Sequence, residues 1–343
     1  MEIKDLILSK IKKQKQVTSA EIIKQTGFSR TFVNRAFQEL RDEGKILLLG
    51  KANSAIYILA EKGAIARAKK PVLKFNGKFI NKNITEEVIL KKIKDQTGIF
   101  LDLKRNVEEI ISYAFLEMTN NAIEHSRSVA INISMVRDKN SISFTVADAG
   151  IGIFANIKNE FKLPDILSAI QFLLKGKHTT APKGHSGQGI FFTSKIADGF
   201  LIKSFGKKVR FINVGKVEDV FLEDTKEKKG TVIFFSMSKD SRKNLRDVFT
   251  DYTEKDTFEF SKTKVVVALY KISRNLLSRS EARRIVLGLE DFKEVFLDFK
   301  GVETVGQGFV DEIFRVWQTA HPKKKIDYTN ANENVEFMIK RTG

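Results

Sequence analysis

Three polar and glycine-rich motifs, in a fixed order along the middle of the chain, constrain the fold more than any other feature of the sequence. The first is Glu117-Met-Thr-Asn-Asn121, within a stretch that has apolar residues at helical spacing. The second, Asp148-Ala-Gly-Ile-Gly152, directly follows a run of alternating residues typical of a strand. The third, Gly184-His-Ser-Gly-Gln-Gly189, precedes an apolar helical stretch. One glycine cluster alone is a weak signal, but the three motifs in this order indicate a nucleotide-binding site.

The residue types in these motifs suit a phosphorylated ligand. Glu117 and Asn121 are one helical turn apart and so share a helix face, where a carboxylate and a carboxamide can orient water and bind Mg²⁺. Glycine lets the backbone approach phosphate oxygens, and a helix N-terminus attracts anions. The plain alternative is that Glu117 and Asn121 only solvate a helix and the glycines only form turns.

The motifs resemble those of the GHKL ATPase superfamily, and the resemblance spans residues 85–237. It implies an α/β sandwich, the Bergerat fold, that binds ATP with Mg²⁺. It also implies that Glu117 is the catalytic general base, that Asn121 coordinates Mg²⁺, and that Asp148 accepts a hydrogen bond from the adenine amino group. The residues that it implies for ATP binding are Asn121, Asp148, Gly150, Gly152, Lys177, Thr179, Gly184, Gly187, Gly189 and Thr231.

The same resemblance implies a mobile lid over the phosphates at residues 154–183. Its polar residues, among them Lys175, Lys177 and Thr179, are then expected phosphate contacts, although each of them is equally compatible with a solvated surface. Whether ATP is hydrolysed, transferred or only bound depends on where Glu117 lies relative to the attacking water, which a sequence does not show.

The charge of the chain is concentrated near its N-terminus. The net charge is +18, and residues 1–80 hold 17 Lys and Arg against 7 Asp and Glu. Such asymmetry indicates a polyanionic partner or a merely basic surface. The absence of cysteine excludes disulfides and thiol catalysis, and no apolar run is long enough to span a membrane. We therefore expect a cytoplasmic protein without a membrane partner.

Residues 1–60 predict three short helices followed by a hairpin. The third helix, residues 30–42, buries one apolar face and projects Arg30, Thr31, Asn34, Arg35 and Gln38 from the other. This pattern resembles a winged helix-turn-helix, in which the third helix enters the major groove of double-stranded DNA. A winged helix that contacts protein instead is the alternative. Residues 61–84 mix charge with Pro and Gly and are expected to be a linker.

The last part of the chain predicts a small α/β domain over residues 256–343, after a connector at residues 238–255. The stretch around residues 297–314 resembles the STAS-like fold of anti-sigma-factor antagonists. Those proteins are phosphorylated on a serine before a helix, whereas this chain has Gly306-Gln-Gly-Phe309 there and no hydroxyl. We therefore expect a docking module for a protein partner or for the ATPase domain, with a passive structural cap as the alternative.

Taken together, the sequence predicts an α+β multidomain protein: winged helix, then GHKL α/β sandwich, then small STAS-like domain. The leading functional hypothesis is a transcription regulator that couples Mg-ATP binding to DNA binding. The alternatives are a serine/threonine protein kinase of the anti-sigma-factor type acting on another chain, a DNA-handling ATPase, or a structural adaptor with a degenerate site. The sequence leaves open a homodimer.

Overall fold

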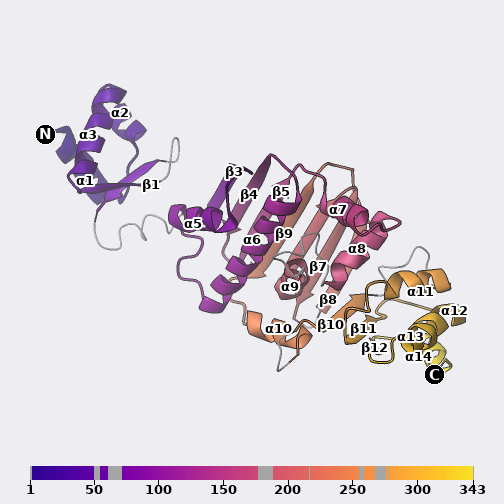
Figure 1. Ribbon diagram of the computed structural model, residues 1–343. Coiled ribbons are helices and arrows are strands. Elements are labelled where there is room, and N and C mark those ends of the chain that lie inside the picture. Colours follow the sequence, from indigo (N-terminus) through magenta and orange to yellow (C-terminus); the bar gives the residue numbers. More distant parts are fainter. Residues whose placement is uncertain are drawn as a thin grey trace. The chain divides into compact units, whose positions relative to one another are not determined.

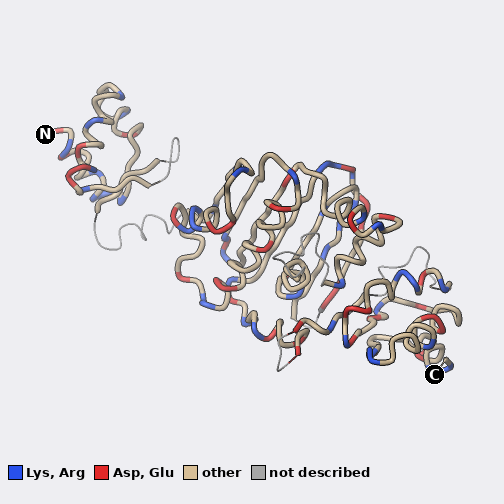
Figure 2. Tube along the Cα trace, in the orientation of Figure 1, with Lys and Arg blue, Asp and Glu red and all other residues tan. Residues whose placement is uncertain are grey.

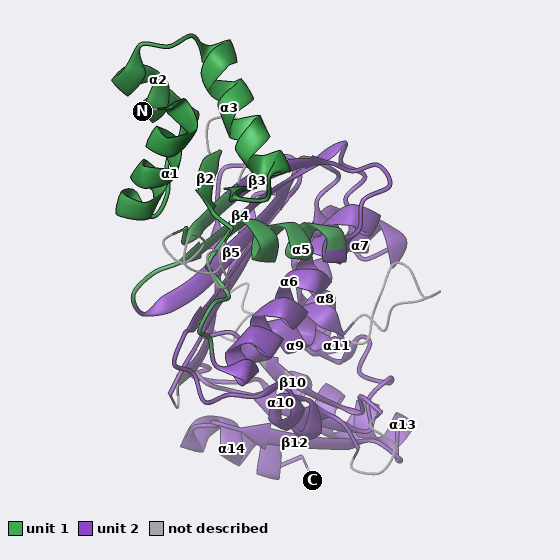
Figure 3. Cartoon of the chain, turned by 90° about the vertical axis from the view of Figure 1, so that its left-hand side faces the viewer, with its two compact units in different colours: residues 1–75, 88–103, 135–139 green, residues 76–87, 104–134, 140–343 purple. Residues whose placement is uncertain are grey.

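The computed structural model describes residues 2–49, 55–60, 72–176, 188–215, 217–254, 259–266, 276 and 278–342 (Figure 1). The chain divides into two compact units, residues 1–75, 88–103 and 135–139, and the remainder (Figure 3). Among the described residues, no helix is both long and apolar enough to cross a bilayer.

The first unit begins with a three-helix module and a hairpin. Its elements are α1 (Ile3–Gln14), α2 (Ser19–Thr26), α3 (Arg30–Asp42), β1 (Ile46–Leu49) and β2 (Ile56–Leu59). Helix α2 begins with a capping box in which Thr18 and Glu21 satisfy each other's backbone N–H groups. The buried side of α3 includes Phe37, whose ring stacks on Tyr57 of β2 with centroids 3.9 Å apart. The expected hairpin turn at residues 50–54 lies outside the described residues.

A seven-stranded sheet forms the centre of the fold, in the order β3-β4-β5-β9-β6-β7-β8. Its strands are β3 (Lys74–Ile80), β4 (Ala130–Arg137), β5 (Ser141–Asp148), β6 (Gly199–Ser204), β7 (Lys207–Val214), β8 (Val217–Asp224) and β9 (Thr231–Ser238). From β5 to β8 every neighbouring pair is antiparallel. Strand β9 is the last strand of this sheet in sequence, yet it lies between β5 and β6. It brings residues 230–231 beside the end of β5.

Helices cover one face of this sheet (Figure 1). They are α6 (Arg105–His125), α7 (Ile153–Glu160), α8 (Ile166–Lys175) and α9 (Gly189–Ile196), while α5 (Glu86–Gln96) buries Ile89, Leu90 and Ile93. Helix α6 carries Glu117 and Asn121, and α9 begins at Gly189, so both ends of the motif series lie on neighbouring helices.

Two expectations from the sequence are corrected here. Residues 74–80 belong to β3, so the linker expected at residues 61–84 does not extend through this strand. The described part of the expected lid, residues 154–176, forms α7 and α8. Helix α8 is buried almost all round, because apolar residues occur on every side of it, and such a helix packs inside a protein.

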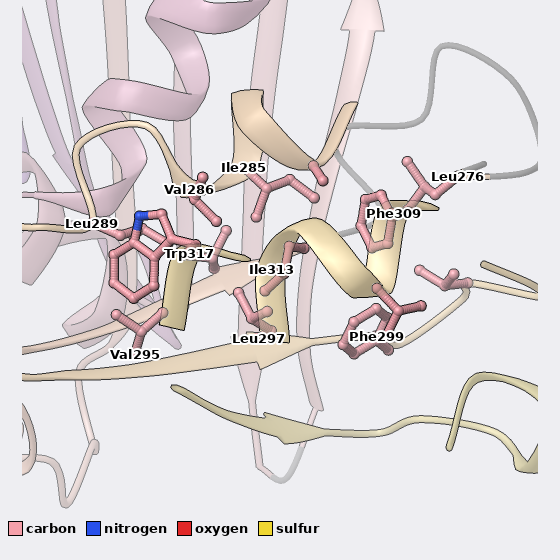
Figure 4. Packing of buried hydrophobic residues seen from close by; sticks show 14 of the residues in the cluster. Leu276, Ile285, Val286, Leu289, Val295, Leu297, Phe299, Phe309, Ile313 and Trp317 are labelled. Atoms are coloured by element: carbon pink, nitrogen blue, oxygen red, sulfur yellow. The ribbon is translucent and has the colours of Figure 1, made fainter. Parts of the chain in front are cut away.

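The C-terminal module has its own three-stranded parallel sheet, in the order β10 (Lys262–Val266), β11 (Glu294–Asp298) and β12 (Lys325–Thr329). Its helices are α11 (Arg279–Val286), α12 (Gln307–Val310), the π-helix η3 (Asp311–Trp317), α13 (Gln318–Ala320) and α14 (Glu333–Lys340), and α10 (Leu245–Tyr252) precedes it. The core of this module includes Leu297, Phe299, Ile313 and Trp317 (Figure 4).

Candidate functional site

The loop after β5 is pressed against the end of α6. The Ile151 amide donates to the Ser126 carbonyl oxygen at 2.9 Å. A Cβ added to Gly150 would lie 1.8 Å from that same oxygen, so only glycine fits at this position. Ser126 is fixed in turn, because its hydroxyl donates to the Ala122 carbonyl at 2.6 Å. The second glycine motif therefore packs against the end of the helix that carries the first motif.

Asp148 lies at the centre of a second close approach, where β5 and β9 end together. Its Oδ1 accepts from the Gly150 amide at 2.8 Å. Gly230 has φ +86°, and a Cβ there would lie 2.0 Å from the Asp148 carbonyl oxygen. The neighbouring Thr231 accepts from the Ile153 amide at 2.9 Å, which fixes the start of α7. Residues from three separate segments therefore hold the Asp148 loop in one conformation.

Burial raises the pKa of the Asp148 carboxyl, and hydrogen bonds from Gly150 and Thr231 oppose that shift. The side chain is half-buried. A carboxylate has about four lone-pair sites, so one that accepts hydrogen bonds from Gly150 and Thr231 keeps acceptor capacity for a further donor. This arrangement suits a ligand group that donates a hydrogen bond.

Glu117 meets the start of α9. A Cβ added to Gly189 would lie 2.0 Å from the Glu117 Oε2 atom, so the carboxylate and the backbone of Gly189 are in direct contact range. The Glu117 charge also contributes to the raised pKa of Tyr113, after the larger effect of burial. A carboxylate at the N-terminus of a helix is electrostatically favoured, and it lies where an anion would also be attracted.

Asn121 is half-buried one turn further along α6. Among the described residues, no cluster of three or more His, Asp or Glu side chains is suited to hold a metal ion. The carboxamide oxygen of Asn121 is a ligand type that Mg²⁺ accepts, usually together with water and substrate phosphate oxygens.

Four of the residues expected to bind ATP lie outside the described residues: Lys177, Thr179, Gly184 and Gly187. The expectation that Lys175 contacts phosphate is wrong. Its ammonium group is buried and donates to the carbonyl oxygens of Leu287 at 2.5 Å and Arg284 at 3.4 Å, at the end of α11.

Helix α9 connects this site to the C-terminal module. Two residues after Gly189, Phe191 and Phe192 enter the core of that module and both contact Phe260, with ring centroids 4.9 and 5.2 Å apart. Phe192 also packs on Phe249 of α10 at 4.3 Å. The apolar core labelled in Figure 4 is therefore continuous with two side chains of α9, the helix whose first residue, Gly189, lies beside Glu117.

The other end of α9 is fixed by side chains from distant segments. Lys243 donates to the carbonyls of Ile196 and Ala197 and pairs with Asp198 at 2.8 Å. Asn213 donates to the Ala197 carbonyl at 2.9 Å. These bonds satisfy carbonyl groups that a helix C-terminus leaves without partners, so they hold α9 as a rigid element. None of these contacts was foreseen from the sequence, since nothing local marks Lys243 as a helix cap.

In the first unit, all five residues expected to contact DNA are exposed on α3: Arg30, Thr31, Asn34, Arg35 and Gln38. Two of them are engaged within the helix, since Arg35 donates to Glu39 at 3.1 Å and Gln38 donates to Asp42 at 2.8 Å. Glu39 also pairs with Lys4. Residues of both charge signs therefore occur along this module (Figure 2), and the acidic residues Glu39 and Asp42 engage two of the residues expected to contact DNA.

Comparison with known proteins bears on the C-terminal module alone. A family model described as a STAS-like domain of unknown function (DUF4325) matches residues 281–336. The chain thus contains a STAS-like domain at its C-terminal end, within an α+β fold. No curated protein matches the chain.

Lys175 is buried where α8 meets the end of α11, and it makes the free energy of unfolding depend on pH. Burial lowers the pKa of Lys175 to about 7, well below the 10.5 of a solvated lysine. Between these values the unfolded chain binds the extra proton and the folded chain does not, so stability rises with pH. From about pH 7.5 to 9.5 we expect the free energy of unfolding to increase by roughly 2 kcal/mol. Urea unfolding followed through Trp317 fluorescence measures this increase.

Lys175→Met is expected to remove that pH-dependent gain, whereas Lys228→Met, on an exposed turn, should retain it. Trp317 is the only tryptophan of the chain and lies in the core beside α11, so its emission reports on the region that Lys175 contacts. Parallel pH profiles for wild type and Lys175→Met would contradict the assignment.

Proposed function

We propose that this chain is an ATP-binding regulatory protein, in which a GHKL-type domain binds Mg-ATP, a winged helix binds double-stranded DNA, and the STAS-like domain senses the nucleotide state. The observation that carries the proposal is the close packing of the Asp148 loop. Gly150, Gly230 and Gly189 each lie where a Cβ would clash with a neighbouring oxygen of the site at 2.0 Å or less. Three such positions at three motifs of one resemblance support a preformed ligand site.

Adenine suits the Asp148 end of this site. Its exocyclic amino group donates a hydrogen bond, which the remaining acceptor capacity of the Asp148 carboxylate would take. Guanine presents a carbonyl at the corresponding position, and two acceptors repel each other. In this proposal Thr231, beside Asp148 on β9, holds the loop and reaches the base through water.

The phosphates would then lie toward the start of α9. The backbone of Gly189 and the helix dipole favour an anion there, and Asn121 would hold Mg²⁺ together with phosphate oxygens. The Glu117 carboxylate is already in contact range of Gly189. A triphosphate that arrives with Mg²⁺ brings the cation that reduces repulsion between its own charge and this carboxylate.

Coupling to the rest of the chain would run through α9, because its first residue contacts Glu117 and its Phe191 and Phe192 pack in the STAS-like domain. A ligand shifts a conformational equilibrium only by its differential affinity for the two states. A shift of the α9 N-terminus on nucleotide binding would move two large side chains in the neighbouring core, which supplies such a difference.

Asp148→Asn tests the adenine contact. The amide places an N–H donor where the carboxylate offers only acceptors, so we expect ATP affinity to fall by about 1.5 to 3 kcal/mol, the value of a hydrogen bond to a charged group. Calorimetric titration with Mg-ATP measures this loss. Asp251→Asn, on the exposed face of α10, is the matched control and should bind as the wild type does. An unaltered titration of Asp148→Asn would refute the assignment.

The coupling itself is tested with labelled duplex DNA titrated with and without Mg-ATP. Because linkage is reciprocal, ATP that alters duplex affinity must also bind with altered affinity when duplex is present. We expect two distinct isotherms, and we expect Arg35→Ala to weaken duplex binding in both. Identical isotherms for the wild type would mean that the two sites act independently.

Catalysis is the second candidate function, and the position of Glu117 favours it. A carboxylate beside the proposed phosphate site is placed to activate water or a hydroxyl. ATP labelled in the γ-phosphate distinguishes three candidate functions. Label on protein indicates a kinase, label released as free phosphate indicates an ATPase, and label that stays in ATP indicates a binding switch. We expect Glu117→Gln to retain ATP binding and to abolish whichever turnover occurs. Loss of binding in Glu117→Gln would show that Glu117 has a structural role.

A further inference from the structure

The face of the seven-stranded sheet opposite its helices carries an aromatic and basic row. On β9, Ile233 and Phe235 are buried in the core, so alternation directs Phe234 to the opposite face. The strand register places Thr145 beside Phe234, Phe234 beside Leu201, Leu201 beside Arg210, and Arg210 beside Phe221. One continuous row therefore crosses five strands.

The two rings of this row are exposed to solvent. Phe234 and Phe221 have 36% and 39% of their surface accessible, which is high for aromatic residues in the middle of strands. The Arg210 guanidinium lies over the Phe221 ring, 4.9 Å from its centroid. Three strand spacings separate the two rings, or about 14 Å at ~4.8 Å each. The rings thus offer two stacking surfaces on one flat face.

Positive charge lies beside these rings. Lys203 of β6 is directly opposite Lys208 of β7 in the register. Like charges in this position destabilise a strand pair unless an anion lies near them. One carboxylate, Glu223, pairs with Lys208 at 2.5 Å and with Arg210 at 3.2 Å. Another, Asp219, pairs with Lys300 at 2.5 Å. Glu223 therefore balances part of the charge on Lys208 and Arg210, and Lys203 adds a further positive charge beside them.

A depression of about 420 Å³, with both polar and apolar residues along it, continues the same face across β3, β4 and β5. It is lined by the side chains of Asn76, Lys78, Asn132, Ser134 and Thr145, together with Gly77, Ile133 and Ala147. Thr145 belongs both to this depression and to the aromatic row, so the two features are continuous. Carboxamides and hydroxyls of this kind can donate and accept hydrogen bonds at base edges.

We propose that this sheet face binds single-stranded nucleic acid. Unpaired bases stack on Phe234 and Phe221, phosphates contact Lys203 and Lys208, and the depression with Lys78 holds the next nucleotide. Stacking on an exposed ring requires a base that is free of its own stack, which excludes an intact duplex. The site lies on the opposite side of the sheet from the Asp148 loop and Glu117, and it does not depend on the proposed ATP site.

The test uses the full chain and fluorescence anisotropy with labelled strands of about 20 thymidines or about 20 uridines, and with a duplex of similar length. Phe221→Thr combined with Phe234→Thr keeps residues that favour strands but removes both rings. We expect the dissociation constant for single strands to rise at least tenfold, with duplex binding and Mg-ATP binding unchanged. Lys203→Gln with Lys208→Gln should lower the salt dependence of single-strand binding by about 1.4 in logarithmic slope.

Phe337→Ala is the matched control, because Phe337 on α14 is more exposed than either ring, at 63%, and lies outside this face. Should the double phenylalanine variant fail to fold, ultraviolet cross-linking of the wild type to thymidine strands replaces it, and labelled peptides should contain Phe221 or Phe234. Binding of either strand type that is lost in the double variant supports the proposal.

Three results would overturn it: no single-strand binding by the wild type, cross-links confined to residues 2–60, or unchanged binding in the folded double variant. If that variant instead converts a dimer to a monomer in sedimentation while strand binding is unchanged, the face is an interface between copies and the proposal is wrong. Arg35→Ala, which should weaken duplex binding alone, keeps failure of this site distinct from failure of the DNA-binding function proposed for α3.

Discussion

The contact between the Glu117 carboxylate and the backbone of Gly189 is the interaction on which the arrangement of the second unit depends. It brings α6 and α9 together, and a Cβ at residue 189 would force the Glu117 carboxylate to move. Lys243 and Asn213 fix the far end of α9. A short helix held at both ends can move as a rigid body, and in the proposed function Phe191 and Phe192 would pass such a movement to the STAS-like domain, in whose core they pack.

The seam between α8 and the C-terminal module combines opposing energetic terms. The aromatic cluster around Phe260 buries large apolar surfaces, which stabilises docking. Ser168, Gln171 and Lys175 on α8 are buried polar groups that cost stability. Within the described part of the chain, the Gln171 amide has no hydrogen-bond partner. Because buried polar groups offset part of the apolar stabilisation, this interface is held less firmly than an all-apolar one, as the proposed response to a nucleotide would require.

The sequence was sufficient for the elements whose patterns are local. The helix that carries Glu117 and the strand that ends at Asp148 were both expected, because each has clear periodicity, and the structure has them as α6 and β5. The STAS-like region was also recognised, and the family match supports it. The close approach of Gly230 to Asp148 became apparent only from the pairing of β5 with β9, although the resemblance had implied a role for the next residue, Thr231.

The failures have identifiable physical causes. Residues 74–80 were assigned to a linker because the Gly and Lys content hid a strand with alternating burial of Phe75 and Phe79. Lys175 was expected to contact phosphate or solvent because the resemblance placed it in the lid. Its partners are instead backbone carbonyls more than 100 residues away. Long-range contacts of this kind leave no periodic signal in a sequence.

The most direct test of the account is a Mg-ATP titration followed through the fluorescence of Trp317, excited selectively at the red edge of its absorption. Trp317 lies in the core that Phe191 and Phe192 enter, remote in sequence from the proposed nucleotide site. The account predicts a saturable change in emission with ATP and none with GTP at the same concentration. Constant emission throughout a titration to millimolar ATP would contradict it.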